Sequence, residues 1–198
     1  MWRRPASVIS VSMLTLPTHV GVVAAGGVFI SEYVEGTSFN KALEIYNGGA
    51  TPLDLSTCTL KLYANGGTGI TTSSPLAASG TLAPGATWVV CSTSAASPLK
   101  DKCNGLIAAV NHNGDDAFAL ECGSVVVDTF GQIGFDPGTG WGAAATDPTF
   151  TVDHTLRRKC GITVGNPTAT TAFDPAVQWN GFAVNSFDGL GAHTVKCP

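Results

Sequence analysis

The chain has 198 residues, a length that suits a single domain with one hydrophobic core. Only 12% of its residues are charged, about half of what soluble domains usually carry, and its 24 glycines and 11 prolines favour short strands joined by turns over long helices. The formal net charge of −4 argues against a protein that binds nucleic acid through an overall basic surface.

The N-terminal segment has the features of a secretory signal peptide. Two arginines stand near the start, residues 8–16 form an apolar stretch, and small residues at 23–26 fit a cleavage site after Ala25. The match is imperfect, and a disordered N-terminal tail is the alternative. We expect a signal peptide over residues 1–25 and a single domain over residues 26–198. No stretch approaches the roughly 20 apolar residues of a membrane-spanning helix.

Four apolar runs in the first half of the domain predict β-strands. Turn-forming Asn-Gly-Gly or Pro-Gly sequences flank three of these runs, which lie at residues 28–34, 41–46, 58–63 and 86–91. In the second run, Leu43 and Ile45 fall on one face of the strand and Glu44 on the other. We expect Glu44 to face outward.

The second half of the domain continues the pattern. Residues 117–121 and 124–130 read as a tight hairpin, and a more polar strand at 154–159 and a last strand at 179–184 follow. Residues 93–104 and 135–152 read as longer loops rich in Gly, Pro, Ser or Ala. About seven to nine short strands with turns between them predict an all-β antiparallel sandwich.

The cysteines predict a disulfide framework. All six follow the predicted signal peptide and none stands at C-x-x-C spacing, so disulfides in an oxidising compartment are favoured over a zinc or thioredoxin motif. Many pairings are possible for six cysteines. The pairing that we expect joins Cys91 to Cys103 locally, Cys160 to Cys197 near the C-terminus, and Cys58 to Cys122 between two strands. Six free thiols in a cytosolic protein are the alternative.

An Asn- and Asp-rich segment at residues 111–116 is a candidate Ca²⁺ site. The oxygens of Asn113, Asp115 and Asp116 are of the kind that Ca²⁺ prefers, but the spacing does not fit the helical calcium-binding loop. The favoured interpretation is a β-turn in which an aspartate caps backbone N–H groups before the next strand.

The segment from Asp153 to Lys159 holds the single basic run of the chain. Asp153 and His154 do not form a catalytic pair, because neighbouring strand residues point to opposite faces. Arg157, Arg158 and Lys159 could contact a phosphate or an acidic partner. A solvated edge strand that its charges protect from pairing is the favoured alternative.

Aromatic and acidic residues suggest two further kinds of site. Flat aromatic rings could form a platform for sugar binding, although core packing is the more common role of a tryptophan in a strand; the candidates are Trp88, Trp141 and Trp179, of which Trp141 is the main one outside the strands. Paired carboxylates could catalyse glycoside hydrolysis, and the candidates are Glu32, Glu35 and Glu44.

A series of motifs follows in order along the chain, at residues 30–36, 40–47, 54–56, 113–117, 128–134, 154–159 and 186–194. In this order they resemble the lamin-tail domain of bacterial secreted proteins. The similarity spans residues 28–194, nearly all of the expected mature chain.

This resemblance implies an immunoglobulin-like β-sandwich, in agreement with the strand pattern. It also implies a secreted or surface module that binds a protein, a glycan or an envelope component, with no catalytic residue of its own and no cofactor beyond the possible Ca²⁺. An accessory domain or piece of a secreted nuclease or phosphatase and a carbohydrate-binding module are the alternatives.

Overall fold

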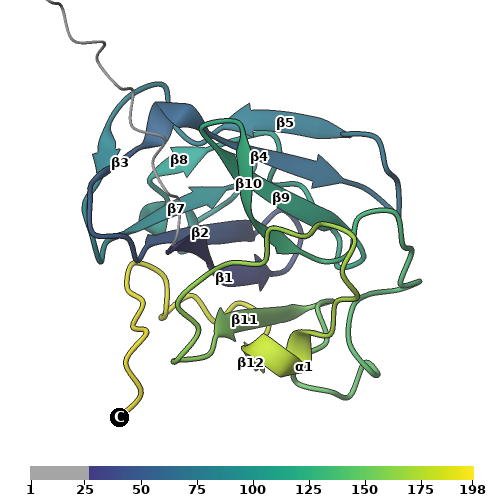
Figure 1. Ribbon diagram of the computed structural model, residues 1–198. Coiled ribbons are helices and arrows are strands. Elements are labelled where there is room, and N and C mark those ends of the chain that lie inside the picture. The colour runs from purple at the N-terminus through teal and green to yellow at the C-terminus, as the bar shows by residue number, and fades with distance from the viewer. Residues whose placement is uncertain (1–26) are drawn as a thin grey trace, which may run out of the picture.

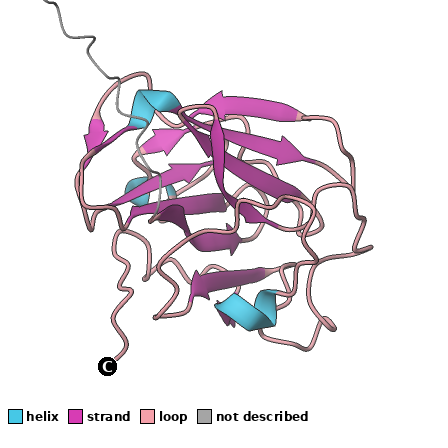
Figure 2. Cartoon of the chain, in the orientation of Figure 1, coloured by secondary structure: helices cyan, strands magenta, loops and turns pink. Residues whose placement is uncertain are grey.

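The computed structural model describes residues 27–198 and shows an all-β protein (Figures 1 and 2). The predicted signal peptide therefore lies outside the described residues. No helix within residues 27–198 is long and apolar enough to cross a membrane. The elements in chain order are β1 (Val28–Glu35), β2 (Lys41–Asn47), β3 (Leu53–Asp54), η1 (Leu55–Thr57), β4 (Cys58–Tyr63), β5 (Thr72–Pro75), β6 (Thr81–Leu82), β7 (Thr87–Cys91), η2 (Lys100–Lys102), β8 (Gly105–Leu106), β9 (Ala117–Cys122), β10 (Val125–Phe130), β11 (His154–Arg158), α1 (Pro175–Gln178) and β12 (Trp179–Ala183).

The strands form two main sheets. One has six strands in the order β12-β11-β1-β2-β7-β8, and the other has four in the order β10-β9-β4-β5. All pairs are antiparallel except β7 with β8. β3 and β6 form a separate two-stranded pair. The predicted immunoglobulin-like sandwich is thus confirmed, and each of the eight predicted strands is present.

The core lies between the two main sheets. Ile30, Tyr33 and Leu43 of the six-stranded sheet pack in one cluster with Leu60 and Phe118 of the four-stranded sheet. Burying a large apolar side chain contributes about 1.5–3 kcal/mol. In β4, buried residues alternate with partly exposed ones, as the period of two predicts for a strand with one covered face.

The outer face of the six-stranded sheet is also covered. Every residue of β1 and β2 is buried, because the C-terminal segment (yellow in Figure 1) crosses this face. Phe187 and Leu190 of that segment pack on Val34, Ala42 and Val89. We call residues 185–194 the C-terminal strap.

The expectation that Glu44 faces outward into solvent is wrong. Glu44 does point away from the core, but only 1% of it is exposed because the strap lies over it. The backbone N–H of Gly191 donates to Glu44 Oε2 over 2.6 Å, and the Ser31 hydroxyl donates to Oε1 over 2.7 Å. Alternation tells which face a residue occupies, and not whether another segment covers that face.

Three disulfides brace the sandwich. Cys58–Cys122 joins facing residues of β4 and β9, Cys91–Cys103 closes a local loop after β7, and Cys160–Cys197 holds the end of the chain. These are the pairs that the sequence led us to expect. No free cysteine occurs within residues 27–198.

A buried ion pair ties three strands of the fold together. Arg158 on β11 donates from Nη2 to Asp128 Oδ2 on β10 over 2.6 Å and from Nε to the Ile30 carbonyl on β1 over 2.8 Å. Asp128 also accepts the backbone N–H groups of Ile30 and Asn166 over 2.8 and 2.7 Å. Arg158 is 4% exposed and Asp128 is 0% exposed. The pair is a structural element of the core.

Candidate functional site

The basic run at residues 157–159 does not form one binding surface. Arg158 is interior, which corrects its assignment as a surface contact. Lys159 donates from Nζ to the carbonyls of Ala176 and Val177 in α1, over 2.7 and 3.3 Å. β11 lies between β1 and β12, so the interpretation as an edge strand is also wrong. The three basic side chains of the run are paired with carboxylates or bonded to backbone carbonyls, so they do not shield an exposed strand edge from pairing.

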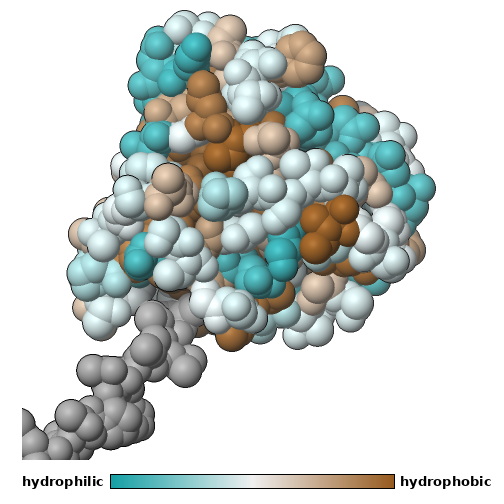
Figure 3. All heavy atoms as spheres, turned by 90° about the horizontal axis from the view of Figure 1, so that it is seen from above, coloured by the Kyte–Doolittle hydropathy of each residue, from teal (hydrophilic) through white to brown (hydrophobic). Residues whose placement is uncertain are grey.

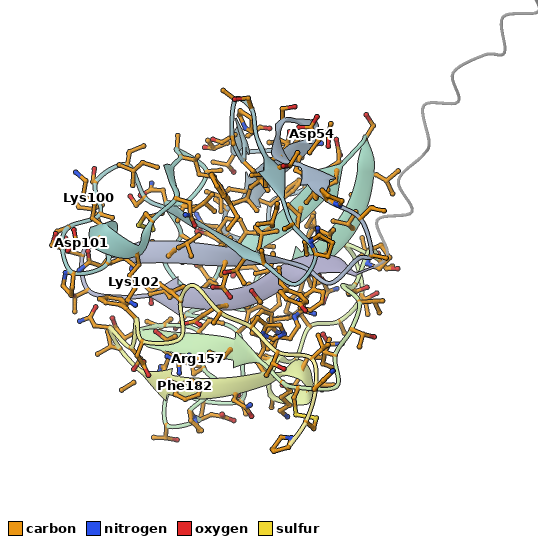
Figure 4. All side chains as sticks on the ribbon, turned by 90° about the vertical axis from the view of Figure 1, so that its left-hand side faces the viewer. Asp54, Lys100, Asp101, Lys102, Arg157 and Phe182 are labelled. Carbon is orange, nitrogen blue, oxygen red and sulfur yellow. A yellow bond between two sulfur atoms is a disulfide. The ribbon has the colours of Figure 1, made fainter. Side chains whose placement is uncertain are left out.

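The Arg157 side chain reaches the surface, where it pairs with two carboxylates. Its guanidinium lies 2.6 Å from Asp188 Oδ1, 3.3 Å from Glu32 Oε1 and 4.0 Å from the centre of the Phe182 ring. Figure 4 shows Arg157 and Phe182 side by side. Because two carboxylates already face Arg157, it offers little net charge to an acidic partner.

A pair of buried carboxylates lies beneath the strap. Glu32 and Glu44 face each other across β1 and β2, and 2% and 1% of them are exposed. Burial raises the pKa of Glu32 to about 7, while Arg157 opposes the shift and the Glu44 charge adds to it. Burial also raises the pKa of Glu44, against hydrogen bonds from Ser31, Gly191 and Thr87.

Gly189 explains why the strap fits so closely over these groups. A Cβ at this position would lie 2.4 Å from Glu32 Oε2 and 2.3 Å from Arg157 Nε. Only glycine leaves room for both side chains, while Phe187 and Leu190 on either side hold the strap to the sheet. The carboxylates are sealed in and are not available as a catalytic pair to a substrate outside.

The burial of Glu32 predicts a pH-dependent stability. The pKa of Glu32 is raised from 4.5 to about 7 in the folded protein, so folding favours the protonated carboxyl. The resulting contribution to the free energy of unfolding is full below the pKa of the unfolded state and is lost as the pH rises toward about 7. Between about pH 5 and pH 8, the free energy of unfolding of the wild type should fall by about 2.5 kcal/mol relative to that of Glu32→Gln. Urea unfolding across this pH range measures the difference.

Glu121→Gln is the matched control, because Glu121 pairs with Lys61 on the outer side of the four-stranded sheet. Its stability curve should run parallel to that of the wild type. Parallel curves for Glu32→Gln and the wild type would contradict the account of Glu32.

Trp141 and Trp179 have structural roles. Trp141 is 3% exposed, its Nε1 donates to the Asp116 carbonyl over 3.0 Å, and its ring lies edge-on to Phe173 at 5.5 Å. Trp179 is 1% exposed and lies under the Arg158 guanidinium at 4.5 Å. A sugar platform on Trp141 or Trp179 is therefore wrong, because both rings are packed inside the protein.

The 111–116 segment is held as a turn. Asp116 accepts the backbone N–H of Asn65 at Oδ1 over 3.1 Å and that of Asn113 at Oδ2 over 3.2 Å. The Asn113 side-chain amide, with its nitrogen toward the carboxylates, donates to Asp116 and Asp115. No group of three or more His, Cys, Asp or Glu side chains within residues 27–198 is arranged to hold a metal ion. These contacts are those of the backbone-capping interpretation.

This turn forms one wall of a cleft. The cleft lies at the end of the sandwich where β1 and β4 end and β9 begins, and Figure 1 shows the ends of these strands. The cleft has a volume of about 480 Å³, within the roughly 300–1,000 Å³ of small-molecule sites. Three loops form it: the β1–β2 turn, the β4–β5 loop and the 111–116 turn. The lining residues are Ser38, Phe39, Lys41, Leu62, Ala64, Asn65, Thr71, Thr72, Asn111, His112, Asn113 and Asp116. We call it the loop-end cleft.

The floor of the loop-end cleft is rigid and polar. The buried His112 bonds through Nε2 to the Val34 carbonyl over 3.0 Å, and burial lowers its pKa to about 3, so the ring is neutral and Nε2 carries the proton. The Lys41 ammonium bonds to the Glu35 carboxylate and to the Gly36 carbonyl. His112 Nε2 and the Lys41 ammonium thus have structural partners, while His112 Nδ1 is buried without a hydrogen-bond partner among the described residues.

The rim of the loop-end cleft is exposed and uncharged. Phe39 stands at the tip of the β1–β2 turn with 55% of its surface exposed. Ser38 and Asn65 both have a positive φ, of 55° and 50°, which few non-glycine residues adopt outside turns and sites. Phe39 is not among the candidate residues that the sequence motifs indicate, and the signal that marks it is a large aromatic residue in a turn between two strands.

Other surfaces offer less. A hollow of about 410 Å³ lies beside α1, but its Thr129 hydroxyl donates to the Asn166 carbonyl and its Gln178 amide accepts from Arg158. On the face seen in Figure 3, apolar side chains (brown) gather in a few places among hydrophilic and neutral ones. The loop-end cleft thus combines an exposed aromatic with polar groups on a rigid base, and it is the candidate site.

The chain matches a known protein family. The family model described as Lamin Tail Domain matches residues 22–134, which is more than half of the chain. No curated protein and no solved structure matches. The matched region includes β1 to β10 and all three loops of the loop-end cleft, while β11 and β12 follow it. The chain therefore belongs to the lamin tail domain family, whose immunoglobulin-like domains are structural or binding modules.

Proposed function

We propose that this protein is a secreted or cell-surface binding module of the lamin-tail type, without catalytic activity, and that it binds its ligand in the loop-end cleft. The observation that carries the proposal is the convergence of three loops around a cleft at one end of a disulfide-braced sandwich. Loops held by a rigid scaffold are where such folds place their binding residues.

The chemistry of the cleft supports binding rather than catalysis. Its titratable side chains serve the structure: Asp116 caps two backbone N–H groups, Lys41 pairs with Glu35, and His112 is neutral and bonded to Val34. A general acid or base needs a site that exchanges protons with a substrate. The rim groups Phe39, Asn65 and Asn111 supply contacts and not reactivity.

The disulfides support secretion, because such bonds persist in oxidising compartments. If the predicted signal peptide is used, protein recovered from the medium or cell surface of the producing organism should begin at Gly26. Mass spectrometry of the N-terminal peptide measures this. Retention of residues 1–25 in protein from the cytosol would contradict the proposal.

The assignment as a non-enzyme is tested on the same purified protein. Nuclease and phosphatase assays with Mg²⁺ or Ca²⁺ should give no turnover above that of heat-unfolded protein. Turnover that follows the protein through purification would contradict the proposal.

A further inference from the structure

The loop-end cleft carries a local negative charge. Asp116 lines it, Asp115 precedes Asp116 on the same turn, and Glu35 is bonded to the lining residue Lys41. Burial raises the pKa of both aspartates, and neighbouring like charges, among them Glu35, add to the shift. The one cation in the lining, Lys41, is already paired. A phosphate, sulfate or carboxylate ligand would meet repulsion here with no free cation to offset it.

Neutral hydrogen-bonding groups point to an uncharged polar ligand. Within residues 27–198, the side-chain amides of Asn65 and Asn111 and the hydroxyls of Ser38 and Thr72 make no hydrogen bond, and all four residues line the cleft. An amide both donates and accepts, as does a hydroxyl. Groups of this kind match a ligand whose own groups also donate and accept, as sugar hydroxyls do.

Phe39 supplies the apolar part of the contact. More than half of its surface is exposed, and it lines the same cleft as the amides. The face of an aromatic ring suits a flat apolar surface such as the C–H face of a sugar ring. One aromatic face among neutral amides and hydroxyls fits a sugar better than it fits a peptide, which is usually recognised by a row of apolar pockets or a strand edge.

We propose that the loop-end cleft binds a neutral oligosaccharide, with Phe39 stacked on one sugar ring and the amides of Asn65 and Asn111 bonded to its hydroxyls. This inference rests on the proposed function and adds the class of ligand. The aromatic residue that would contact the sugar is then the exposed Phe39 and not one of the buried tryptophans.

The experiment titrates the purified protein with defined tetrasaccharides, by calorimetry and by saturation-transfer NMR. The neutral probes are cellotetraose, maltotetraose, mannotetraose and chitotetraose, and the anionic probes are tetragalacturonate and a heparin tetrasaccharide. At least one neutral probe should bind and neither anionic probe should. Phe39→Ala and Asn111→Ala should each weaken that binding about tenfold.

Phe135→Ala is the matched control, because Phe135 is an equally exposed phenylalanine (51%) outside the cleft. Its affinity should equal that of the wild type, and all three variants should keep the wild-type melting temperature. Neutral binding that survives both Phe39→Ala and Asn111→Ala, binding of anionic probes alone, or no binding of any neutral probe would overturn the inference. If a protein or peptide binds to the wild type and this binding is lost in Phe39→Ala, the assignment of a sugar ligand is overturned, while the proposed function as a binding module stands.

Discussion

Replacing Arg158 with alanine should lower the free energy of unfolding by about 3–5 kcal/mol. The change leaves the Asp128 carboxylate, which is 0% exposed, in the core without its cation, and it removes the hydrogen bonds from Arg158 to Ile30 and Gln178. Burial already raises the pKa of Asp128, and the Arg158 charge opposes that shift. Urea unfolding at neutral pH, followed by tryptophan fluorescence, measures the loss.

Lys61→Ala is the control, because it removes an ion pair of similar length from the surface. Lys61 lies 2.6 Å from Glu121, with side chains 20% and 26% exposed, and its loss should cost less than about 1 kcal/mol. If Arg158→Ala lowers the free energy of unfolding no more than Lys61→Ala does, the buried Arg158–Asp128 pair does not hold the strands together as proposed.

Removing the Cys58–Cys122 disulfide is expected to have the second large effect. The bond closes a loop of 64 residues and thereby lowers the entropy of the unfolded chain. Loss of this constraint should lower the free energy of unfolding by about 4 kcal/mol. Cys58 is also fully buried in the core, so Cys58→Ala with Cys122→Ala leaves a cavity in addition. Thermal and urea unfolding of the double variant, compared with the wild type, measure the effect.

The Cys91–Cys103 bond provides the matched comparison, since it closes only 12 residues. The loop term for this pair is about 3 kcal/mol, and Cys91 is as fully buried as Cys58, so the variant with Cys91→Ala and Cys103→Ala should lose about 1 kcal/mol less than the Cys58–Cys122 variant. A larger loss from this pair than from Cys58–Cys122 would contradict the assignment of Cys58–Cys122 as the main brace.

The strands could be predicted because their apolar residues alternate and their turns contain Gly, Pro and Asn. The four short strands that were missed, β3, β5, β6 and β8, have only two to four residues each, too few for a period of two to show. Their sequences, such as Thr72–Pro75, also resemble those of turns.

The burial of polar residues could not be predicted in the same way. Glu44 sits where the strand pattern places a solvent-facing residue, yet the strap covers it. Arg158 shares a strand face with the core residue Leu156, where its charge argues against burial, yet Asp128 pairs with it. Both contacts come from segments far away in the sequence, separated by 147 and 30 residues. A local pattern carries no information about such a partner.

The loop-end cleft was hidden for the same reason. Its walls come from the β1–β2 turn, the β4–β5 loop and the 111–116 turn, which only the fold brings together. The sequence points to one of the three, through Asn113 and Asp116, and favours a backbone-capping turn there over a Ca²⁺ site. The structure uses those side chains to hold the turn, and Phe39 on another loop provides the exposed aromatic.

The most direct test of the central claim maps the ligand on the protein. Two-dimensional ¹H–¹⁵N NMR of the purified protein should show, on addition of the bound tetrasaccharide, amide shifts at residues 36–40, 64–72 and 111–116. The strap and the hollow beside α1 should stay unchanged. Shifts that gather at residues 165–178, or at Arg157 and the strap, would contradict the claim that this protein binds through its loop-end cleft.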